Sequence, residues 1–314
     1  MSSIVTLTMN PALDVSTSVD HVEPLSKLRC GAGRRDPGGG GINVARVASR
    51  LGAGVTAVYP VGGFMGQLLN RLVDEEGLKS VIVPVRGETR EDFTVLDKTT
   101  GEQYRFVMPG PELRDAEWMA CLEVLAGLGA GPDIICASGS LPPGVPGDVY
   151  ARVAGIARSR GAKLVLDTSG AALEAALEAR VYLIKPNLRE FRQLMGVPLD
   201  GQASLIRACR SLIGRGSTEV VALTLGADGA LLVTAGGAWR APALPIQPVS
   251  TVGAGDSFLG AMVWALASKM SLEECFRYAV AGGSAAVLAP GTELCRQQDV
   301  RRLLTQVTLE SVPD

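Results

Sequence analysis

The stretch Ser250-Thr-Val-Gly-Ala-Gly-Asp-Ser257 stands immediately before an apolar segment with helical spacing. Gly253 and Gly255, on either side of Ala254, let backbone N–H groups point into one space without a Cβ in the way. The positive end of the following helix adds to these donors, so the three residues predict an anion hole. Asp256 is then placed to accept a proton from a hydroxyl beside a phosphate, although a carboxylate in a first helical turn can also be purely structural.

Outside this stretch, short apolar runs alternate with helical segments. The predicted strands are 4–8, 55–61, 133–137, 163–167, 181–185 and 219–225, and the predicted helices are 42–51, 148–160, 171–178, 188–195, 203–213, 255–268 and 271–288. Such alternation is typical of a mainly parallel sheet covered by helices on both faces, which is an α/β fold of three layers. We expect residues 307–314 to form a loose tail.

Two segments, approximately 15–35 and 88–108, break this alternation. The first is extended, and residues 92–107 within the second are typical of two strands joined by a turn at 99–101. We expect the two segments to pair into a small β-sheet that covers the carboxyl edge of the main sheet as a lid. Residues 1–314 would then form a single domain with a discontinuous lid.

The composition is that of a globular protein, with 47% hydrophobic residues, 20% charged residues and a formal net charge of −2. No long basic run is present, which argues against nucleic acid as a partner. Without a C-x-x-C pair, a signal peptide or an apolar run long enough to cross a membrane, we expect a cytoplasmic protein with reduced thiols and no membrane partner. The only histidine, His21, excludes a multi-histidine zinc site, and we interpret it as a surface residue.

Two further motifs follow predicted strands and could hold a nucleotide. Asn187 and Glu190, in Lys185-Pro-Asn-Leu-Arg-Glu190, have the spacing of a helix capping box, and they could equally hold water and Mg²⁺ beside triphosphate oxygens. The stretch Thr224-Leu-Gly-Ala-Asp-Gly229 has the Asp-Gly pair of a hairpin turn before a strand at 230–234. Its exposed amides are an alternative platform for a nucleotide.

A run of four glycines opens the first long helix in Asp36-Pro-Gly-Gly-Gly-Gly-Ile-Asn43. Such a run allows a ligand to contact the backbone directly. It is not a dinucleotide fingerprint, because Asn43 replaces the third glycine, and the chain has no Gly-Lys pair for a Walker A motif.

Charged residues near the lid could recognise a substrate. Asp14 follows the first strand, where a carboxylate can bind two sugar hydroxyls or simply serve a turn. Lys27 and Arg29 lie in one lid segment, and Arg90 and Arg105 flank the other. Basic residues are usually solvated, but these four would bind a phosphate if they converged over one site.

In this order, the glycine run, the Asn187-x-x-Glu190 motif and the Gly253–Asp256 motif resemble the ribokinase-like (PfkB) family of carbohydrate kinases, over about Thr6 to Cys295. The resemblance implies a three-layer αβα domain with a β lid that also forms a homodimer, with ATP and Mg²⁺ as cofactors and K⁺ as a further ion. Stretches such as Gly101–Gly110 and Ser138–Gly144 are similar to members that phosphorylate fructose 6-phosphate on its C1 hydroxyl, a step of glycolysis.

The resemblance also implies roles for individual residues. Asp256 would be the general base, with Gly253, Ala254 and Gly255 as the anion hole. The sugar would contact Asp14, Gly39, Asn43 and Ser138, and its phosphate would contact Lys27, Arg29 and Arg90. ATP would contact Lys185, Asn187, Thr224, Gly226, Gly229 and Ser284, with Glu190 holding Mg²⁺ through water. A monovalent cation would bind near Ser250, Val252, Ala286 and Gly291.

Other functions stay open at this point. The start Asn10-Pro-Ala-Leu-Asp14 is also common in family members that phosphorylate tagatose 6-phosphate or fructose 1-phosphate. A regulator that binds a sugar phosphate without catalysis is an alternative from a different class, since a fold alone does not guarantee an activity. Asp256 and its flanking glycines argue against that alternative, because a pure binding protein needs no base.

Overall fold

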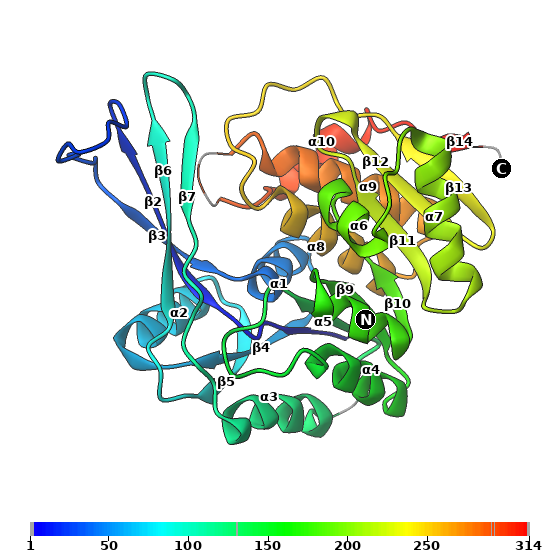
Figure 1. The fold of residues 1–314 in the computed structure, drawn as a ribbon, viewed down its shortest axis with the longest axis horizontal. Helices are drawn as coiled ribbons and strands as arrows, with labels where there is room; N and C mark the ends of the chain where they lie inside the picture. Colours follow the sequence, from blue (N-terminus) through cyan, green and yellow to red (C-terminus); the bar gives the residue numbers. More distant parts are fainter. Residues whose placement is uncertain (1–2, 130, 290, 292, 313–314) are drawn as a thin grey trace.

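The computed structural model describes residues 3–129, 131–289, 291 and 293–312, and in it a large sheet is covered by helices while a small sheet stands apart (Figure 1). The large sheet has the strand order β14-β13-β12-β11-β10-β9-β8-β1-β4-β5. Its strands are β1 (Ile4–Leu7), β4 (Val55–Val61), β5 (Lys79–Pro84), β8 (Ile134–Ser138), β9 (Lys163–Asp167), β10 (Val181–Ile184), β11 (Thr218–Thr224), β12 (Ala230–Thr234), β13 (Gly237–Ala241) and β14 (Glu310–Val312).

Both faces of the large sheet are buried under helices. Successive side chains of its central strands point to opposite sides and so contribute to two separate clusters. Ile4 and Cys136 belong to one apolar cluster, and their neighbours Val5 and Ile135 belong to the other. The first cluster includes residues of α1 (Gly40–Arg50), α2 (Gly63–Glu75), α8 (Ala254–Ala267), α9 (Leu272–Ala286) and α10 (Gln297–Leu304). The second includes α3 (Asp115–Gly127), α4 (Val149–Ser159), α5 (Ala171–Glu178), α6 (Leu188–Met195) and α7 (Gln202–Gly214). The predicted three-layer α/β fold is confirmed.

The order of the strands creates a crevice at the carboxyl edge of the large sheet. From β11 to β5 the neighbouring strands are parallel, and β1 lies between β4 and β8. The chain therefore leaves β1 toward one side of the sheet and later returns to its other side. Ligands of open α/β sheets bind at such a reversal.

The small sheet has the order β3-β2-β6-β7, with β2 (Ala12–Val19), β3 (Arg34–Gly38), β6 (Arg90–Asp97) and β7 (Gln103–Phe106). Both segments that break the alternation contribute to it, and it rises beside the large sheet in Figure 1. At its tip, the buried Asp97 carboxylate accepts the N–H groups of Val22 and Thr99 and contacts His21 Nδ1 at 2.9 Å. The hydrogen bond from the Val22 N–H has the largest effect, and together these bonds hold the pKa of Asp97 at about 2. His21, predicted to be a surface residue, is half exposed and pairs with Asp97.

One prediction about the end of the chain is wrong. Residues 310–312, expected in a loose tail, form β14, which pairs antiparallel with β13. Three residues are too short to show a period, and an edge strand is stabilised mainly by backbone hydrogen bonds to its neighbour. Residues 313 and 314 lie outside the described part. Within the described residues, every helix is too short or too polar to cross a lipid bilayer.

Candidate active site

The starts of two helices meet at Asp256. Gly253 caps α8 with φ of 75°, a left-handed conformation that favours glycine, and Asp256 follows in the first turn. Its Oδ2 accepts a hydrogen bond of 2.8 Å from Nδ2 of Asn43, in the first turn of α1. Burial raises the pKa of Asp256, and the Asn43 bond and the nearby cation Lys185 offset only part of this rise. The carboxylate is thus a stronger base than a free aspartate.

A buried ion pair lies beside this carboxylate. Lys185 follows β10, and its Nζ lies 3.1 Å from Oδ1 of Asp167 at the end of β9. The Ser138 hydroxyl donates to the other Asp167 oxygen at 3.4 Å. Burial lowers the pKa of Lys185, but Asp167, Glu190 and Asp256 outweigh burial and raise it, so the amine is charged. Asp167 was not predicted as a site residue. Its only signal in the sequence is its place at the end of an apolar run.

The glycine run has a packing reason in addition to the predicted contact with a ligand. A Cβ on Gly38 would lie 2.4 Å from the Asp14 carboxylate, and one on Gly41 would lie 2.5 Å from the Leu7 carbonyl oxygen. Gly39 has φ of 106°. The run therefore lets the start of α1 pack directly against β1 and the small sheet. Protein atoms rather than open space face these positions.

Asp14 faces the site from the small sheet. In the strand register it lies between Asp36 of β3 and Asp92 of β6. The pKa of Asp14 is raised to about 7, first by burial and then by the charges of Asp92 and Asp256, while Arg105 and Arg46 act in the opposite direction. The charge of Asp256 acts on Asp14, so the two carboxylates are near enough to interact. Proximity to a second carboxylate favours the neutral form.

A cavity of about 500 Å³ adjoins α8 and has the size of a nucleotide site. Its walls include apolar side chains such as Leu244, Ile246, Phe258, Val280 and Val287. Seven predicted residues line it: Asn187, Thr224, Gly226, Gly229, Ala254, Gly255 and Ser284. The structure therefore brings together, around one cavity, residues separated by almost 100 positions of the sequence.

The Asn187–Glu190 capping box forms at the edge of this cavity. Asn187 Oδ1 accepts the N–H of Glu190 at 2.9 Å, and Glu190 Oε2 accepts the N–H of Asn187 at 2.9 Å. The Glu190 charge also acts on Lys185 and Asp167. Carboxylate oxygens such as those of Glu190 and Asp167 are of the ligand type that Mg²⁺ prefers.

The predicted cation residues lie in adjoining loops and at the end of α9. The Ser250 hydroxyl donates to the Gly291 carbonyl at 3.1 Å and accepts the Val252 N–H at 3.2 Å. The Ser250 N–H donates to the Val287 carbonyl, directly after Ala286 at the end of α9. Two contacts tie these loops to the small sheet: Ser250 Oγ to Gln103 Oε1 at 3.2 Å, and Arg34 to Glu293 at 2.8 Å.

The predicted phosphate-binding residues are not all together. Lys27 and Arg29 are exposed in the loop between β2 and β3, at the outer end of the small sheet (Figure 1). Arg90 lies at its base, where it donates to the carbonyls of Met108 and Asn10 and pairs with Asp92 at 3.4 Å. The positive charge of Arg105, on β7, acts on both Asp14 and Asp256.

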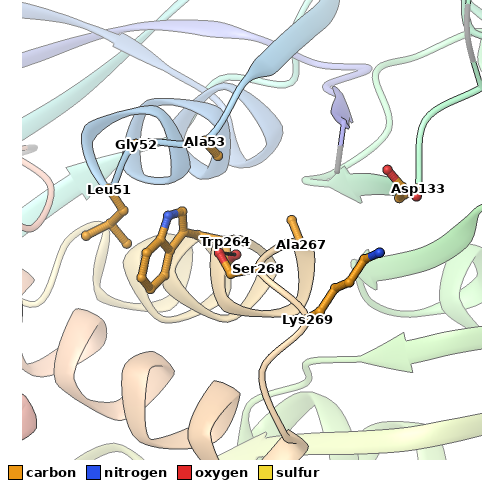
Figure 2. A pocket seen from close by; sticks show the side chains of 8 residues that line it. All are labelled: Leu51, Gly52, Ala53, Asp133, Trp264, Ala267, Ser268 and Lys269. Carbon is orange, nitrogen blue, oxygen red and sulfur yellow. Dashed lines mark hydrogen bonds between the residues drawn. The ribbon is translucent and has the colours of Figure 1, made fainter. Parts of the chain in front are cut away.

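A second depression, of about 690 Å³, lies at the other ends of the same two helices (Figure 2). Leu51 follows α1 there, and Trp264 and Lys269 belong to the last turn of α8 and its exit. At 1.5 Å per residue, the 11 positions from Asp256 to Ala267 at the end of α8 correspond to about 16 Å. The depression does not share the helix starts that favour an anion.

Comparison with known proteins agrees with the motifs. The model of the pfkB family of carbohydrate kinases matches residues 5–299. An ATP-dependent 6-phosphofructokinase isozyme 2 of Mycobacterium tuberculosis is 47% identical, over 95% of this chain and 88% of the relative. The Escherichia coli protein of the same name is 40% identical, over 96% of this chain and 98% of the relative.

Solved structures of the E. coli phosphofructokinase-2 are similar along nearly the whole length. The complex with potassium has a TM-score of 0.93 at 39% identity, and the complex with fructose-6-phosphate has 0.92 at 38%. Each comparison covers 98% of this chain and 99% of the other. The family model, the identities and the shared fold together show that the chain belongs to the pfkB family of carbohydrate kinases.

Proposed function

We propose that this chain is an ATP-dependent 6-phosphofructokinase, which transfers the γ-phosphoryl group of ATP to the C1 hydroxyl of fructose 6-phosphate. One observation carries the proposal: Asp256 stands at a helix start between the nucleotide-sized cavity and the Asp14 side of the small sheet. A hydroxyl bound there would have a base on one side and a phosphate site on the other. The names of the relatives at 40% and 47% identity support the choice of sugar.

The base works through one of its two oxygens. Asn43 binds Oδ2 of Asp256, so Oδ1 is the oxygen offered to the C1 hydroxyl. Asp256 accepts the proton as the hydroxyl oxygen attacks the γ-phosphorus in line with the leaving ADP. The N–H groups of Gly253, Ala254 and Gly255 and the positive end of α8 then stabilise the developing negative charge.

Lys185, Glu190 and the cavity orient the nucleotide. The Lys185 amine lies 3.6 Å from where a Cβ of Gly255 would stand, which puts a fixed positive charge beside the anion hole. Glu190, through water and next to Asp167, would hold Mg²⁺, which when bound neutralises charge on the phosphate oxygens. Thr224, Gly226, Gly229 and Ser284 line the rest of the cavity with Asn187.

The sugar would lie under the small sheet, which we propose acts as a lid formed by residues of approximately 15–35 and 88–108. Asp14, Gly39, Asn43 and Ser138 would contact its hydroxyls. Lys27, Arg29 and Arg90 would bind its 6-phosphate, with the first two moving in from their exposed loop. The whole of 1–314 then forms one kinase domain, closed over its substrates.

A bulky side chain in the cavity should exclude ATP. We expect Ser284→Phe to raise KM for ATP by at least about tenfold and to leave KM for the sugar phosphate within about twofold, because the phenylalanine would fill the space of the nucleotide's base. The matched control is Ser268→Phe in the exposed depression of Figure 2, which should leave both constants unchanged. If Ser268→Phe instead weakened ATP binding, the nucleotide site would be the wrong one.

Loss of the Arg90 guanidinium should affect the sugar phosphate selectively. We expect Arg90→Ala to raise KM for fructose 6-phosphate by about tenfold or more, with a far smaller effect on ATP, because a charge-assisted contact to phosphate is lost. Arg90 also anchors the carbonyls of Asn10 and Met108. Melting curves recorded alongside the kinetics separate the two roles, and equal changes in both KM values would contradict phosphate binding.

Two further proposals concern the ion and the assembly. A K⁺ ion would bind carbonyl oxygens around Ser250, Val252, Ala286 and Gly291, as the potassium complex of the E. coli relative suggests. A homodimer would form through the lid, whose β7 and following residues expose large apolar side chains. These are Tyr104, Phe106, Val107 and Met108. Burial of such a patch between two copies is favourable.

The direct test is release of ADP with Mg-ATP against four acceptors: fructose 6-phosphate, tagatose 6-phosphate, fructose 1-phosphate and fructose. We expect a clear preference for fructose 6-phosphate. Preference for either of the other sugar phosphates would keep the reaction and change the substrate. No turnover with any acceptor, in a protein that binds fructose 6-phosphate, would favour the non-catalytic regulator.

A further inference from the structure

Arg46 has the largest fully buried side chain of the described residues, in a place where an unpaired charge would be costly. It lies in α1, one turn after Asn43, with a side chain 1% exposed. Its Nε donates to Glu76 Oε1 at 2.8 Å and its Nη2 donates to the same oxygen at 2.5 Å, while Nη1 donates to the Pro37 carbonyl at 2.8 Å. The guanidinium is therefore held in one orientation.

The same guanidinium contacts the residue that binds the base. Nη1 of Arg46 also donates to Oδ1 of Asn43 at 3.2 Å, and Nδ2 of Asn43 donates to Oδ2 of Asp256 at 2.8 Å. A side-chain amide has one accepting end and one donating end. Between a cation and a carboxylate, only one of its two orientations satisfies both neighbours. In the reverse orientation the Asn43 oxygen would face the Asp256 carboxylate.

We propose that Arg46, held by Glu76, is a positioning residue for phosphoryl transfer: it fixes the Asn43 amide so that the amide always donates to Asp256. The inference rests on the proposed role of Asp256 as the base. With its side chain 1% exposed, Arg46 would not touch a substrate itself. It acts through Asn43, which leaves Oδ1 of Asp256 as the oxygen for the hydroxyl.

Glu76 completes the chain from the end of α2. Burial raises its pKa, but hydrogen bonds and charge from Arg46 and Arg50 outweigh burial and lower the pKa, so Glu76 is ionised at neutral pH. Arg50, one turn further along α1, donates to the other Glu76 oxygen at 3.2 Å. It shares the carboxylate with Arg46 but is not among the groups that contact Asn43 or Asp256. The protein therefore offers a matched control on the same helix.

The charges around Asp256 determine what loss of Arg46 would do. From α1, Asn43 and Arg46 favour the ionised form, as do Lys185 after β10 and Arg105 on β7. The opposing or titratable groups are Asp14 on β2, Asp167 on β9 and the Cys136 thiol on β8. Loss of Arg46 removes one cation and releases the amide, and both changes disfavour the ionised base. Because the reaction needs that ionised form, the acid limb of the kcat profile should move to higher pH.

The experiment compares pH profiles of kcat for Arg46→Gln, Glu76→Gln and the control Arg50→Gln. We expect Arg46→Gln to lower kcat by about tenfold at about pH 6 and by less at about pH 9, with KM for ATP within about twofold. Glu76→Gln should move the limb in the same direction by a smaller amount. Arg46→Lys should recover part of the loss, because it keeps the charge without the fixed geometry. Arg50→Gln should leave the limb in place.

The outcomes separate positioning from simple stability. A folded Arg46→Gln protein whose acid limb coincides with that of the wild type would overturn the proposal, whatever its melting temperature. If Arg46→Gln did not fold, an unchanged acid limb of the kcat profile in Glu76→Gln would overturn the proposal equally. A shift of the acid limb in Arg50→Gln as large as that in Glu76→Gln would also overturn it. An inactive Asp256→Asn protein combined with an unmoved limb would reject the Arg46 role alone, while an active Asp256→Asn protein would reject the base.

Discussion

We expect Asp256→Asn to lower kcat by about 10²–10⁴-fold, the usual contribution of general-base catalysis, while KM for both substrates stays close to wild type. An amide cannot take the proton of the C1 hydroxyl. The substitution keeps the size of the side chain, and its carbonyl oxygen can still accept the hydrogen bond from Nδ2 of Asn43. It also removes a buried charge whose pKa is raised by burial, so the fold should not be weakened at neutral pH.

The measurement is steady-state kinetics at saturating Mg-ATP, with melting curves for both proteins. A matched control is Asp299→Asn, which changes a carboxylate of α10 that pairs with Arg302 near the surface. The control should retain full turnover. Turnover of Asp256→Asn close to wild type would reject the base, whereas a loss confined to KM would assign Asp256 to binding alone.

The sequence could place Asp256 and Asn43 each at a helix start, because glycines and apolar spacing mark both starts. It could not show that the two side chains meet, since 213 positions separate them. The contact depends on a close approach of α1 and α8: a Cβ on Gly260 would lie 2.6 Å from Cβ of Val47. A single glycine inside an apolar helix gives no signal of which helix it faces.

The small sheet shows the same limit. Extended segments could be recognised from composition, but their pairing partners follow from the tertiary fold. Arg90 and Lys27 are both cations in these segments, yet one is bound to backbone carbonyls and the other is exposed in a loop. Buried polar atoms must find partners, and in this protein the partner of a basic residue is often a carbonyl that no motif predicts.

Helices α2, α3 and α10 were not predicted, and α3 shows why. Trp118 and Leu125 face the core, but Met119 on the other side is also apolar and exposed. Without a polar face, the 3.6-residue period that marks a surface helix is lost. Residues of the proposed nucleotide cavity were easier to place together, because two of its loops follow the parallel strands β10 and β11, whose carboxyl ends meet at a single edge.

The second large effect concerns Asp14, for which we expect affinity and stability to change in opposite directions. Asp14→Asn should raise KM for the sugar phosphate by about 10–100-fold, because an ionised acceptor of hydroxyl groups is replaced by a neutral one. KM for ATP should stay within about twofold, since the residue lies on the small sheet, away from the nucleotide cavity. The unliganded protein should nevertheless become more stable at alkaline pH.

The sign of the stability effect follows from the raised pKa. Asp14 has a pKa of about 7 in the folded protein against an ordinary value of 3.8, so the folded state binds its proton more tightly than the unfolded state. The wild type therefore has its full stability from this group below about pH 4 and loses it as the pH rises to about 7. Asparagine does not titrate, so at pH 8 the variant avoids this loss, which amounts to about 2–4 kcal/mol.

Melting temperatures of both proteins at about pH 5 and pH 8, without ligand, measure this difference. The gain of Asp14→Asn over the wild type should be larger at pH 8, while Asp20→Asn, a change of an exposed carboxylate on the adjacent loop, should show no such trend. A difference in melting temperature that does not change with pH would mean that burial, Asp92 and Asp256 do not raise the pKa of Asp14. A larger gain at high pH, together with the loss of sugar affinity, would show that the protein gives up stability to keep a carboxylate where the substrate binds.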